Sequence, residues 1–351
     1  AAAKIEDNAF SDAERLLAEC RKSEFRHWET GRLWHLCQQS VQTFEAEGPI
    51  ESVAYSPGGD RALLGGWDGC VRIVALAGET PPIVIAHGGF VHAVAFSHSG
   101  RIVASGGDDC RVRLWDAASG APLGVMAGHG DAVVSLDFSP DDQWVLSGSY
   151  DGTARIWDAA TGHGLSVLEG HSWWVWQAAF SPDASRILTA SQDGRVIVWS
   201  VSNREGRLQC EPQTEFNGHG GPVYSAAFSP DGVQVASAGY DGRVMTWNPA
   251  DVKPVDLAAR IAGMAEPEPP HQTFRGHSGS ASCVVYSPNG RLIASAGHDN
   301  LVNIWDRQSA TLIKSLRGHG GQVRSCRFSP DGQVVLSGSH DGQAKTWSLA
   351  G

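Results

Sequence analysis

The chain has 351 residues and a formal net charge of -11 at pH 7. A net negative charge argues against a general nucleic-acid or anionic-membrane binder, because phosphate binding draws on clustered Lys and Arg. No apolar stretch approaches the about 20 residues that a bilayer requires, and the seven cysteines include no C-x-x-C pair, which predicts free thiols in a reducing compartment. We therefore expect a cytoplasmic protein with no membrane or nucleic-acid partner.

Residues 1–40 do not repeat and are expected to form a helical extension. Apolar side chains recur at helical spacing over residues 13–20, behind a Ser-Asp pair that can cap a helix. Residues 24–37 are expected to form a second helix, so the two predict an αα-hairpin packed on the rest of the chain. The sequence begins at Ala1 without an initiator Met, and we interpret it as a piece of a longer protein.

One sequence unit recurs from residue 41 onward, and we take 41–351 as a single repeat domain. In six copies a His is followed 28 residues later by a Trp, as in His129 and Trp157. Between them lie an apolar segment, usually a Ser-Pro turn, a second apolar segment, and usually an Asp-Gly pair suited to a tight hairpin. The His positions are His87, His129, His171, His219, His277 and His319, and the Trp positions are Trp115, Trp157, Trp199, Trp247, Trp305 and Trp347.

A seventh, degenerate copy precedes these six. Aligned on its Ser-Pro pair, it carries Ala46 where the others have His, Leu64 where they have Ser or Thr, and Val74 where they have Trp. Its Asp68 keeps the common Asp position without these neighbours. We expect this copy to be the least rigid part of the repeat domain.

Each copy predicts four antiparallel strands, and a unit of about 40–45 residues has the length of a propeller blade. The sequence stops just after Trp347, one strand short of a complete last blade, while residues 41–44 match the pattern of a fourth strand. We predict that this N-terminal strand completes the last blade and removes the open edges of the ring. Longer spacings between copies place insertions near 200–213 and 248–271.

The repeat, quoted at residues 128–158 as GHGDAVVSLDFSPDDQWVLSGSYDGTARIWD, resembles the WD-repeat (WD40) family over roughly residues 41 to 349. The resemblance implies an all-β, seven-bladed propeller in which His, Ser or Thr, Asp and Trp form a buried hydrogen-bonded tetrad in each regular blade. Four polar groups that satisfy one another can occupy a core that would otherwise penalise each of them. The tetrads are His87, Ser105, Asp109 and Trp115; His129, Ser147, Asp151 and Trp157; His171, Thr189, Asp193 and Trp199; His219, Ser237, Asp241 and Trp247; His277, Ser295, Asp299 and Trp305; and His319, Ser337, Asp341 and Trp347.

A second resemblance concerns the N-terminal extension. The strings AERLLAEC, RHWE and RLWHLC look like the junction before WD repeats in large planctomycete-type bacterial proteins, many of them Ser/Thr kinases. This implies that the chain is the docking or regulatory part of a bacterial signalling protein. The sequence itself carries no phosphate-binding glycine loop followed by a strand lysine, and no H-R-D motif.

The abundance of His and Asp does not predict catalysis, because most of these residues occupy repeat positions. The Ser, His and Asp of one blade belong to a tetrad between strands and do not form an activated nucleophile in a cleft. Among the remaining histidines, His298 and His340 share one position in adjacent blades and are the only pair worth testing for a metal site. We predict a protein that is not an enzyme and holds no cofactor or metal.

The resemblance also implies a binding surface. In WD-repeat proteins the top face exposes three positions per blade, which lie three, five and twenty-one residues after the tetrad His. We predict a scaffold that grips a peptide or partner domain there, anchored by Trp174, Trp176, Tyr224 and Tyr240, with Arg324 and Asp108 adding charge selectivity. The predicted site comprises Trp67, Phe90, His92, Asp108, Tyr150, Trp174, Trp176, Tyr224, Tyr240, His298, Arg324 and His340.

Four alternatives remain open at this stage. The aromatic positions could pack around the channel mouth or under the N-terminal helices. They could form a sensor for a small ligand or a methylated ammonium group, with Asp108 or Glu51 supplying the carboxylate. The ring could only display neighbouring domains of a longer chain, or it could be a hydrolase that depends on a metal. We expect a monomeric propeller whose protein partner the sequence does not name.

Overall fold

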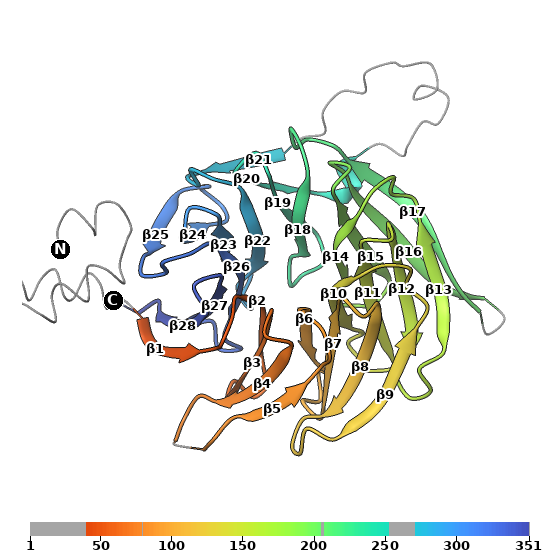
Figure 1. Ribbon diagram of the computed structural model, residues 1–351. Coiled ribbons are helices and arrows are strands. Elements are labelled where there is room, and N and C mark those ends of the chain that lie inside the picture. Colours follow the sequence, from red (N-terminus) through yellow and green to blue (C-terminus); the bar gives the residue numbers. More distant parts are fainter. Residues whose placement is uncertain (1–39, 79, 205–206, 253–270, 351) are drawn as a thin grey trace, which may run out of the picture.

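A computed structural model describes residues 40–78, 80–204, 207–252 and 271–350. The helices expected within 1–40 and most of the insertion at 248–271 lie outside these residues. The described part forms seven four-stranded antiparallel sheets arranged in a ring (Figure 1). The prediction of an all-β, seven-bladed propeller is confirmed.

Each blade runs outward from an innermost strand to an outermost one, and in blades one to six the four strands follow chain order. The blades are β2 (Ile50–Tyr55), β3 (Arg61–Gly66), β4 (Cys70–Ala75) and β5 (Ile83–Ala86) in blade one; β6 (Val91–Phe96), β7 (Ile102–Gly107), β8 (Arg111–Asp116) and β9 (Pro122–Ala127) in blade two; β10 (Val133–Phe138), β11 (Trp144–Ser149), β12 (Thr153–Asp158) and β13 (Gly164–Glu169) in blade three; β14 (Val175–Phe180), β15 (Arg186–Ser191), β16 (Val196–Arg204) and β17 (Arg207–Phe216) in blade four; β18 (Val223–Phe228), β19 (Val235–Gly239), β20 (Arg243–Trp247) and β21 (His271–Arg275) in blade five; β22 (Ala281–Tyr286), β23 (Leu292–Gly297), β24 (Val302–Asp306) and β25 (Leu312–Leu316) in blade six; and β26 (Val323–Phe328), β27 (Val334–Ser339), β28 (Gln343–Ser348) and β1 (Ser40–Glu45) in blade seven.

The ring closes through the N-terminal strand. β1 pairs with β28 in an antiparallel register that places Phe44 opposite Ala344, and the innermost strand β26 lies beside β2. The first strand of the chain therefore completes the last blade, and the seven innermost strands surround the channel without a break. Such closure removes the unpaired sheet edges on which other chains can add strands.

The described part of the first insertion lengthens a hairpin. β16 and β17 are the two longest strands, and they stay paired from Val196 and Phe216 out to Arg204 and Arg207. Figure 1 shows this hairpin projecting beyond the outer edge of blade four. After the last strand before the second insertion, a short 3-10 helix η1 (Pro249–Asp251) is capped by the side chain of Asn248.

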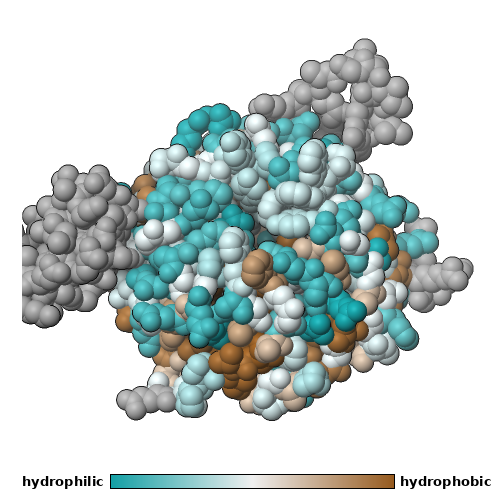
Figure 2. All heavy atoms as spheres, viewed as in Figure 1, coloured by the Kyte–Doolittle hydropathy of each residue, from teal (hydrophilic) through white to brown (hydrophobic). Residues whose placement is uncertain are grey.

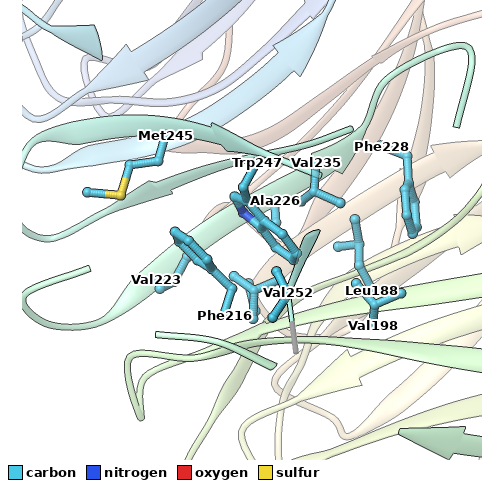
Figure 3. Packing of buried hydrophobic residues seen from close by; sticks show 12 residues of the cluster. Leu188, Val198, Phe216, Val223, Ala226, Phe228, Val235, Met245, Trp247 and Val252 are labelled. Carbon is cyan, nitrogen blue, oxygen red and sulfur yellow. The ribbon is translucent and has the colours of Figure 1, made fainter. Parts of the chain in front are cut away.

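The hydrophobic core lies between neighbouring blades. In the cluster of Figure 3, Leu188 and Val198 of blade four meet Val235 and Trp247 of blade five, and Phe216 packs flat on the Trp247 indole. Alternate residues along each strand point to opposite faces of its sheet, so both faces of every blade contribute to such a cluster. Truncating a large aromatic residue at this depth typically removes about 3–5 kcal/mol of stability.

The hairpin between the second and third strands of a blade requires a left-handed residue after the common Asp. Gly152 supplies it in blade three with a φ of 82°. Blade two has Cys110 at this position with a φ of 61°, and blade six has Asn300 with a φ of 66°. Asn tolerates this conformation better than most residues, whereas Cys110 bears a strain of about 1–2 kcal/mol.

Blade one replaces the polar tetrad with apolar packing. Leu64 is buried, and Ala46 and Val74 pack against the same hydrophobic cluster. Asp68, which has no tetrad partners in this blade, forms an ion pair with Arg72 in which the nitrogen and oxygen lie 2.6 Å apart. An apolar substitute for a buried polar network is often neutral or stabilising, so the loss of the tetrad does not by itself weaken this blade.

Candidate interaction face

The tetrads tie together the loops that build one end of the propeller. In blade three, Nδ1 of His129 lies 2.8 Å from an Asp151 oxygen, and Nε2 of the same ring lies 2.7 Å from the Ser147 hydroxyl. The Ser147 hydroxyl also accepts a hydrogen bond of 2.8 Å from the Trp157 indole N–H. Asp151 also accepts the backbone N–H of Gly130 at 2.9 Å. The chain of donors and acceptors therefore fixes the loop before the first strand to the hairpin between the second and third.

The same arrangement recurs in four further blades, with the His87 ring turned so that Nδ1 faces the serine. The His–hydroxyl and indole–hydroxyl distances are 2.9 and 2.7 Å for His87, Ser105 and Trp115; 2.7 and 2.9 Å for His171, Thr189 and Trp199; 2.7 and 2.8 Å for His277, Ser295 and Trp305; and 2.8 and 2.7 Å for His319, Ser337 and Trp347. The corresponding His–Asp contacts are 3.3 Å to Asp109, 3.0 Å to Asp193, 3.0 Å to Asp299 and 2.9 Å to Asp341.

Blade five departs from the expected tetrad. His219 contacts Ser237 at 2.8 Å and Asp241 at 3.1 Å, but the buried indole N–H of Trp247 has no hydrogen-bond partner. The Trp247 ring instead stacks on Phe216, with 4.6 Å between centroids and 7° between planes. The expectation that Trp247 joins the hydrogen-bonded network is therefore wrong, because aromatic stacking takes the place of that bond.

Burial and the partner residue act in opposite directions on the pKa of the tetrad groups. Burial alone would raise the pKa of Asp241, but the His219 hydrogen bond and charge outweigh it and lower that pKa to about 2. Burial lowers the pKa of His319, against the opposing effect of Asp341. An imidazole that donates one N–H to the carboxylate and accepts from the hydroxyl bonds both partners, so the buried polar atoms satisfy one another.

Four predicted residues form a continuous group at the channel mouth, which we call the aromatic arc: Tyr150, Trp174, Trp176 and Tyr224. The Tyr150 centroid lies 4.7 Å from Trp174 and 5.0 Å from Trp176. The Trp176 and Tyr224 rings meet edge to face at 5.3 Å. The arc therefore spans the tops of blades three, four and five.

Exposure differs along the arc. Trp174 is 37 % exposed, whereas Tyr150, Trp176 and Tyr224 are half-buried. The Trp176 indole N–H donates to the side-chain oxygen of Gln192 at 2.8 Å, which fixes its ring. The neighbouring Trp173 was missed by the sequence analysis because it falls outside the three family positions, yet it is 57 % exposed and lies 6.4 Å from Trp174.

The opposite side of the mouth is an ionic group, which we call the charged arc: Glu51, Arg324, His298 and His340. A Glu51 oxygen lies 2.8 Å from the Arg324 guanidinium and the other lies 2.7 Å from His340, while Arg324 contacts His298 at 2.9 Å. Burial raises the pKa of Glu51, but Arg324 and His340 lower it to about 2. Arg324 is thus paired with a carboxylate of the same face, and its part in charge selectivity stays a prediction.

The histidine pair proposed for a metal test does not converge on a common point. His298 faces Arg324, and His340 faces Glu51. Within the described ranges, no group of three or more His, Cys, Asp or Glu side chains is placed to hold a metal ion. The positive charge of Arg324 beside His298 also disfavours a cation there.

The two arcs join through the remaining predicted residues. Trp67 stacks on Phe90 at 5.6 Å and contacts the His340 ring at 5.0 Å. On the other flank, the Tyr224 and His298 rings stack at 6.1 Å. Tyr240, in the next loop of blade five, is 60 % exposed.

Asp108 provides an accessible carboxylate beside the aromatic arc. Its side chain is 47 % exposed and lies 2.6 Å from Nε2 of His92, whose ring is 6.2 Å from that of Tyr150. The order Asp108, His92, Tyr150, Trp174 therefore places a negative charge at one end of the arc. The part of Asp108 in charge selectivity stays a prediction.

The channel below the mouth is narrow and polar. Its cavity of about 70 Å³ is far smaller than the roughly 300–1,000 Å³ of pockets that enclose drug-sized ligands. The residues lining it include Glu51, His92, Trp176, Tyr224 and Arg324 near the mouth, with Ser52, Ser225, Cys283, Ser325 and Arg327 farther along.

Seven blades, six of them held by His–Ser/Thr–Asp networks, define the chain as a β-propeller of repeated hairpin units. It belongs to the WD-repeat family: the family model described as WD domain, G-beta repeat, matches residues 38–74, 80–116, 120–158, 162–200, 210–248, 268–306 and 310–348. Propeller domains of this family generally mediate protein–protein interactions.

The chain is also similar to two individual proteins. It is 38 % identical over 47 residues to the WD40 repeat-containing protein HOS15 of Arabidopsis thaliana, a match that covers 13 % of this chain and 8 % of that protein. A crystal structure of the WD40 β-propeller domain of Doa1 matches with a TM-score of 0.74 and 23 % identity, covering 89 % of this chain and 96 % of that one. The structural likeness supports the fold. In the part of the chain that the structure describes, no helix is long and apolar enough to span a membrane.

Proposed function

We propose that the chain is a non-catalytic interaction scaffold that binds a peptide segment or partner domain across its top face. The observation that carries the proposal is the aromatic arc, extended by the exposed Trp173. Aromatic side chains that cluster at a surface are typical of the energetic centre of protein interfaces. The proposal includes the role of this chain as the docking or regulatory part of a larger cytoplasmic protein.

The arc is suited to binding because contacts within the chain hold its side chains in place. Ring contacts hold Trp174 and Trp176 against Tyr150, and the tetrads His129–Asp151 and His171–Asp193 fix the loops on which the rings stand. A surface that is already ordered loses less conformational freedom on association. A partner side chain therefore gains contact area at a smaller entropic cost.

The charge distribution favours a partner with a basic residue beside an apolar one. Asp108 is exposed next to the arc, whereas Arg324 and Glu51 neutralise each other at the far side. A Lys or Arg of the partner can reach Asp108 while an apolar neighbour packs on Trp174. Pairs of this kind contribute chiefly to specificity and to the association rate.

Binding of a small ligand or a methylated ammonium group is the second candidate function. One observation favours it: Asp108 and the Tyr150 and Trp174 rings follow one another in space along one side of the channel mouth. The small channel cavity counts against a ligand enclosed in the ring. The first candidate requires only the open face. A trimethyl-lysine peptide and its unmodified counterpart distinguish the two, because only a cage responds to methylation.

A display selection tests the scaffold. The immobilised chain is offered a random peptide library, and the binders are compared with those of a Trp173→Ala, Trp174→Ala variant. The matched control is Leu123→Ala, Val125→Ala, which removes two exposed apolar side chains from β9, an outer strand. Figure 2 shows that the hydrophobic surface of the viewed side gathers toward its lower edge, where blades one and two lie.

We expect peptides that pair an aromatic or aliphatic residue with Lys or Arg, bound by the parent and the β9 control and lost by the Trp variant. Near-ultraviolet circular dichroism and melting curves establish that all three proteins are folded. Equal capture by parent and Trp variant would place the binding surface elsewhere on the propeller. Loss of capture in the β9 control alone would assign it to the outer strands.

A further inference from the structure

A cysteine lies in the wall of the channel at a position where other blades carry serine. Four innermost strands have a serine there, and its hydroxyl accepts a backbone N–H from the next innermost strand. The donors and acceptors are Val53 and Ser325, Val94 and Ser52, Ala178 and Ser135, and Val284 and Ser225. In blade six the equivalent residue is Cys283 of β22, which lines the channel cavity.

Two neighbours in β26 surround the Cys283 sulfur. Sγ of Cys283 lies 3.6 Å from the carbonyl oxygen of Cys326 and 3.4 Å from Nη1 of Arg327. Cys326, whose carbonyl makes the first of these contacts, has a fully buried thiol between blades six and seven. Arg327 is held in place by its own bond of 2.8 Å to the Cys326 carbonyl. The site therefore combines two thiols, one guanidinium and an opening to the channel.

The surrounding charges divide the two thiols into a nucleophile and a partner. The Cys326 S–H and the Arg327 charge lower the pKa of Cys283, against the opposing effect of burial. The pKa of Cys326 is raised by the neighbouring Cys283 sulfur and by burial. Burial raises the pKa of Asp137 of β10 to about 6, against the opposing effect of the Arg327 charge.

Two other cysteines that the structure places, Cys110 and Cys210, lie in a different environment. Burial and nearby carboxylates raise the pKa of Cys110, and burial raises that of Cys210. A thiol reacts as its thiolate, so a neighbouring cation favours reaction and burial alone does not. Cys283 thus combines a cation, a second thiol and a place on the cavity wall.

We propose that Cys283 is a thiol-modification site inside the channel, where it takes small electrophiles and is oxidised by hydrogen peroxide, with Cys326 as the resolving thiol. The Cys283 thiolate attacks one peroxide oxygen, the O–O bond breaks, and the departing hydroxide takes up the proton that the Cys283 thiol released on ionising, so that it leaves as water. The sulfur is then a sulfenic acid, oxidised by two electrons as peroxide is reduced. Attack by the Cys326 thiol forms the S–S bond and releases a second water, joining β22 to β26.

The channel selects reagents by size. A cavity of about 70 Å³ admits a few water-sized groups, so peroxide and iodoacetamide fit and a polymer-linked maleimide does not. This modification is separate from partner binding, since the sulfur lies below the mouth and outside the aromatic arc.

Alkylation of the complete folded chain tests the nucleophile. Iodoacetamide is applied at about pH 6, where a thiol of ordinary pKa near 8.5 is only ~0.3 % thiolate. Peptide mass spectrometry then gives the rate at each cysteine. We expect Cys283 to react at least about tenfold faster than Cys110, and Arg327→Met to remove that advantage while Arg327→Lys retains it. Equal rates at Cys283 and Cys110 in the parent would overturn the proposal.

Peroxide tests the resolving thiol. The parent should give a Cys283–Cys326 cross-linked peptide, and Cys326→Ser should give instead a Cys283 sulfenic acid that dimedone traps. Cys110→Ser is the matched control and should behave as the parent does. Absence of both the cross-link and the dimedone adduct, in proteins shown to be folded by near-ultraviolet circular dichroism, would refute the oxidation step.

Discussion

Two serines at the same tetrad position of different blades should contribute unequally to the free energy of unfolding. The structure gives the size of the difference. Ser147 and Ser237 are both fully buried. The Ser147 hydroxyl forms hydrogen bonds with His129 and with the Trp157 indole. Of the two rings of its own tetrad, Ser237 bonds only His219, because the Trp247 indole N–H has no hydrogen-bond partner. Leaving one buried polar partner unsatisfied costs about 1–3 kcal/mol. Ser147→Ala should therefore lower the free energy of unfolding by about 2–6 kcal/mol, and Ser237→Ala by about 1–3 kcal/mol.

Urea denaturation followed by tryptophan fluorescence measures both variants beside the parent. The two substitutions delete the same atom, so differences in hydrophobicity and side-chain entropy cancel between them. The predicted result is a lower midpoint for Ser147→Ala than for Ser237→Ala. Equal losses would refute the view that the Trp247 indole stands outside its tetrad and that stacking on Phe216 has replaced the bond.

Three further predictions follow from the fold. Burial lowers the folded-state pKa of His87 and His319, so the unfolded chain binds more protons than the folded one. The contribution of these histidines to the free energy of unfolding is fully present above the unfolded pKa of about 6.5 and is lost as the pH drops through the folded-state pKa values. Melting curves at a series of pH values will show this loss, and a flat profile between pH ~7 and ~5 would contradict it. Cys110→Gly should raise the free energy of unfolding by about 0.5–1 kcal/mol, because glycine relieves the left-handed strain at a φ of 61°, and Gly152→Cys is the reverse control. Deleting residues 1–45 removes β1 and opens blade seven, and should lower the melting temperature and promote association measured by light scattering, whereas deleting 1–38 should not open that edge.

Much of the architecture could be predicted from the sequence because the repeat expresses a local requirement. A His 28 residues before a Trp, with Asp before a left-handed residue between them, specifies one blade with little reference to the others. Closure by the N-terminal strand follows from counting strands, since the last copy ends one short. The family positions likewise placed Tyr150, Trp174 and Trp176 at one surface, where their rings meet.

The remainder depended on contacts between distant parts of the chain. Glu51 neutralises Arg324 across 273 residues, a pairing that exists only after the ring closes. The stacking of Trp247 depends on Phe216, which β17 of the preceding blade supplies after a lengthened hairpin. The Cys283 and Cys326 pair likewise requires two neighbouring innermost strands, and no spacing rule connects the two residues.

The affinity of a selected peptide for the parent and for single variants tests the central claim most directly. Isothermal titration gives Kd for the parent, Trp174→Ala, Asp108→Asn and Leu123→Ala. An anchor residue of an interface is worth about 2 kcal/mol or more, so Trp174→Ala should weaken binding at least about thirtyfold. Asp108→Asn should weaken it less and reduce its salt dependence, and Leu123→Ala should leave it unchanged. An unchanged Kd for Trp174→Ala in a folded protein would contradict the assignment of the aromatic arc as the binding surface.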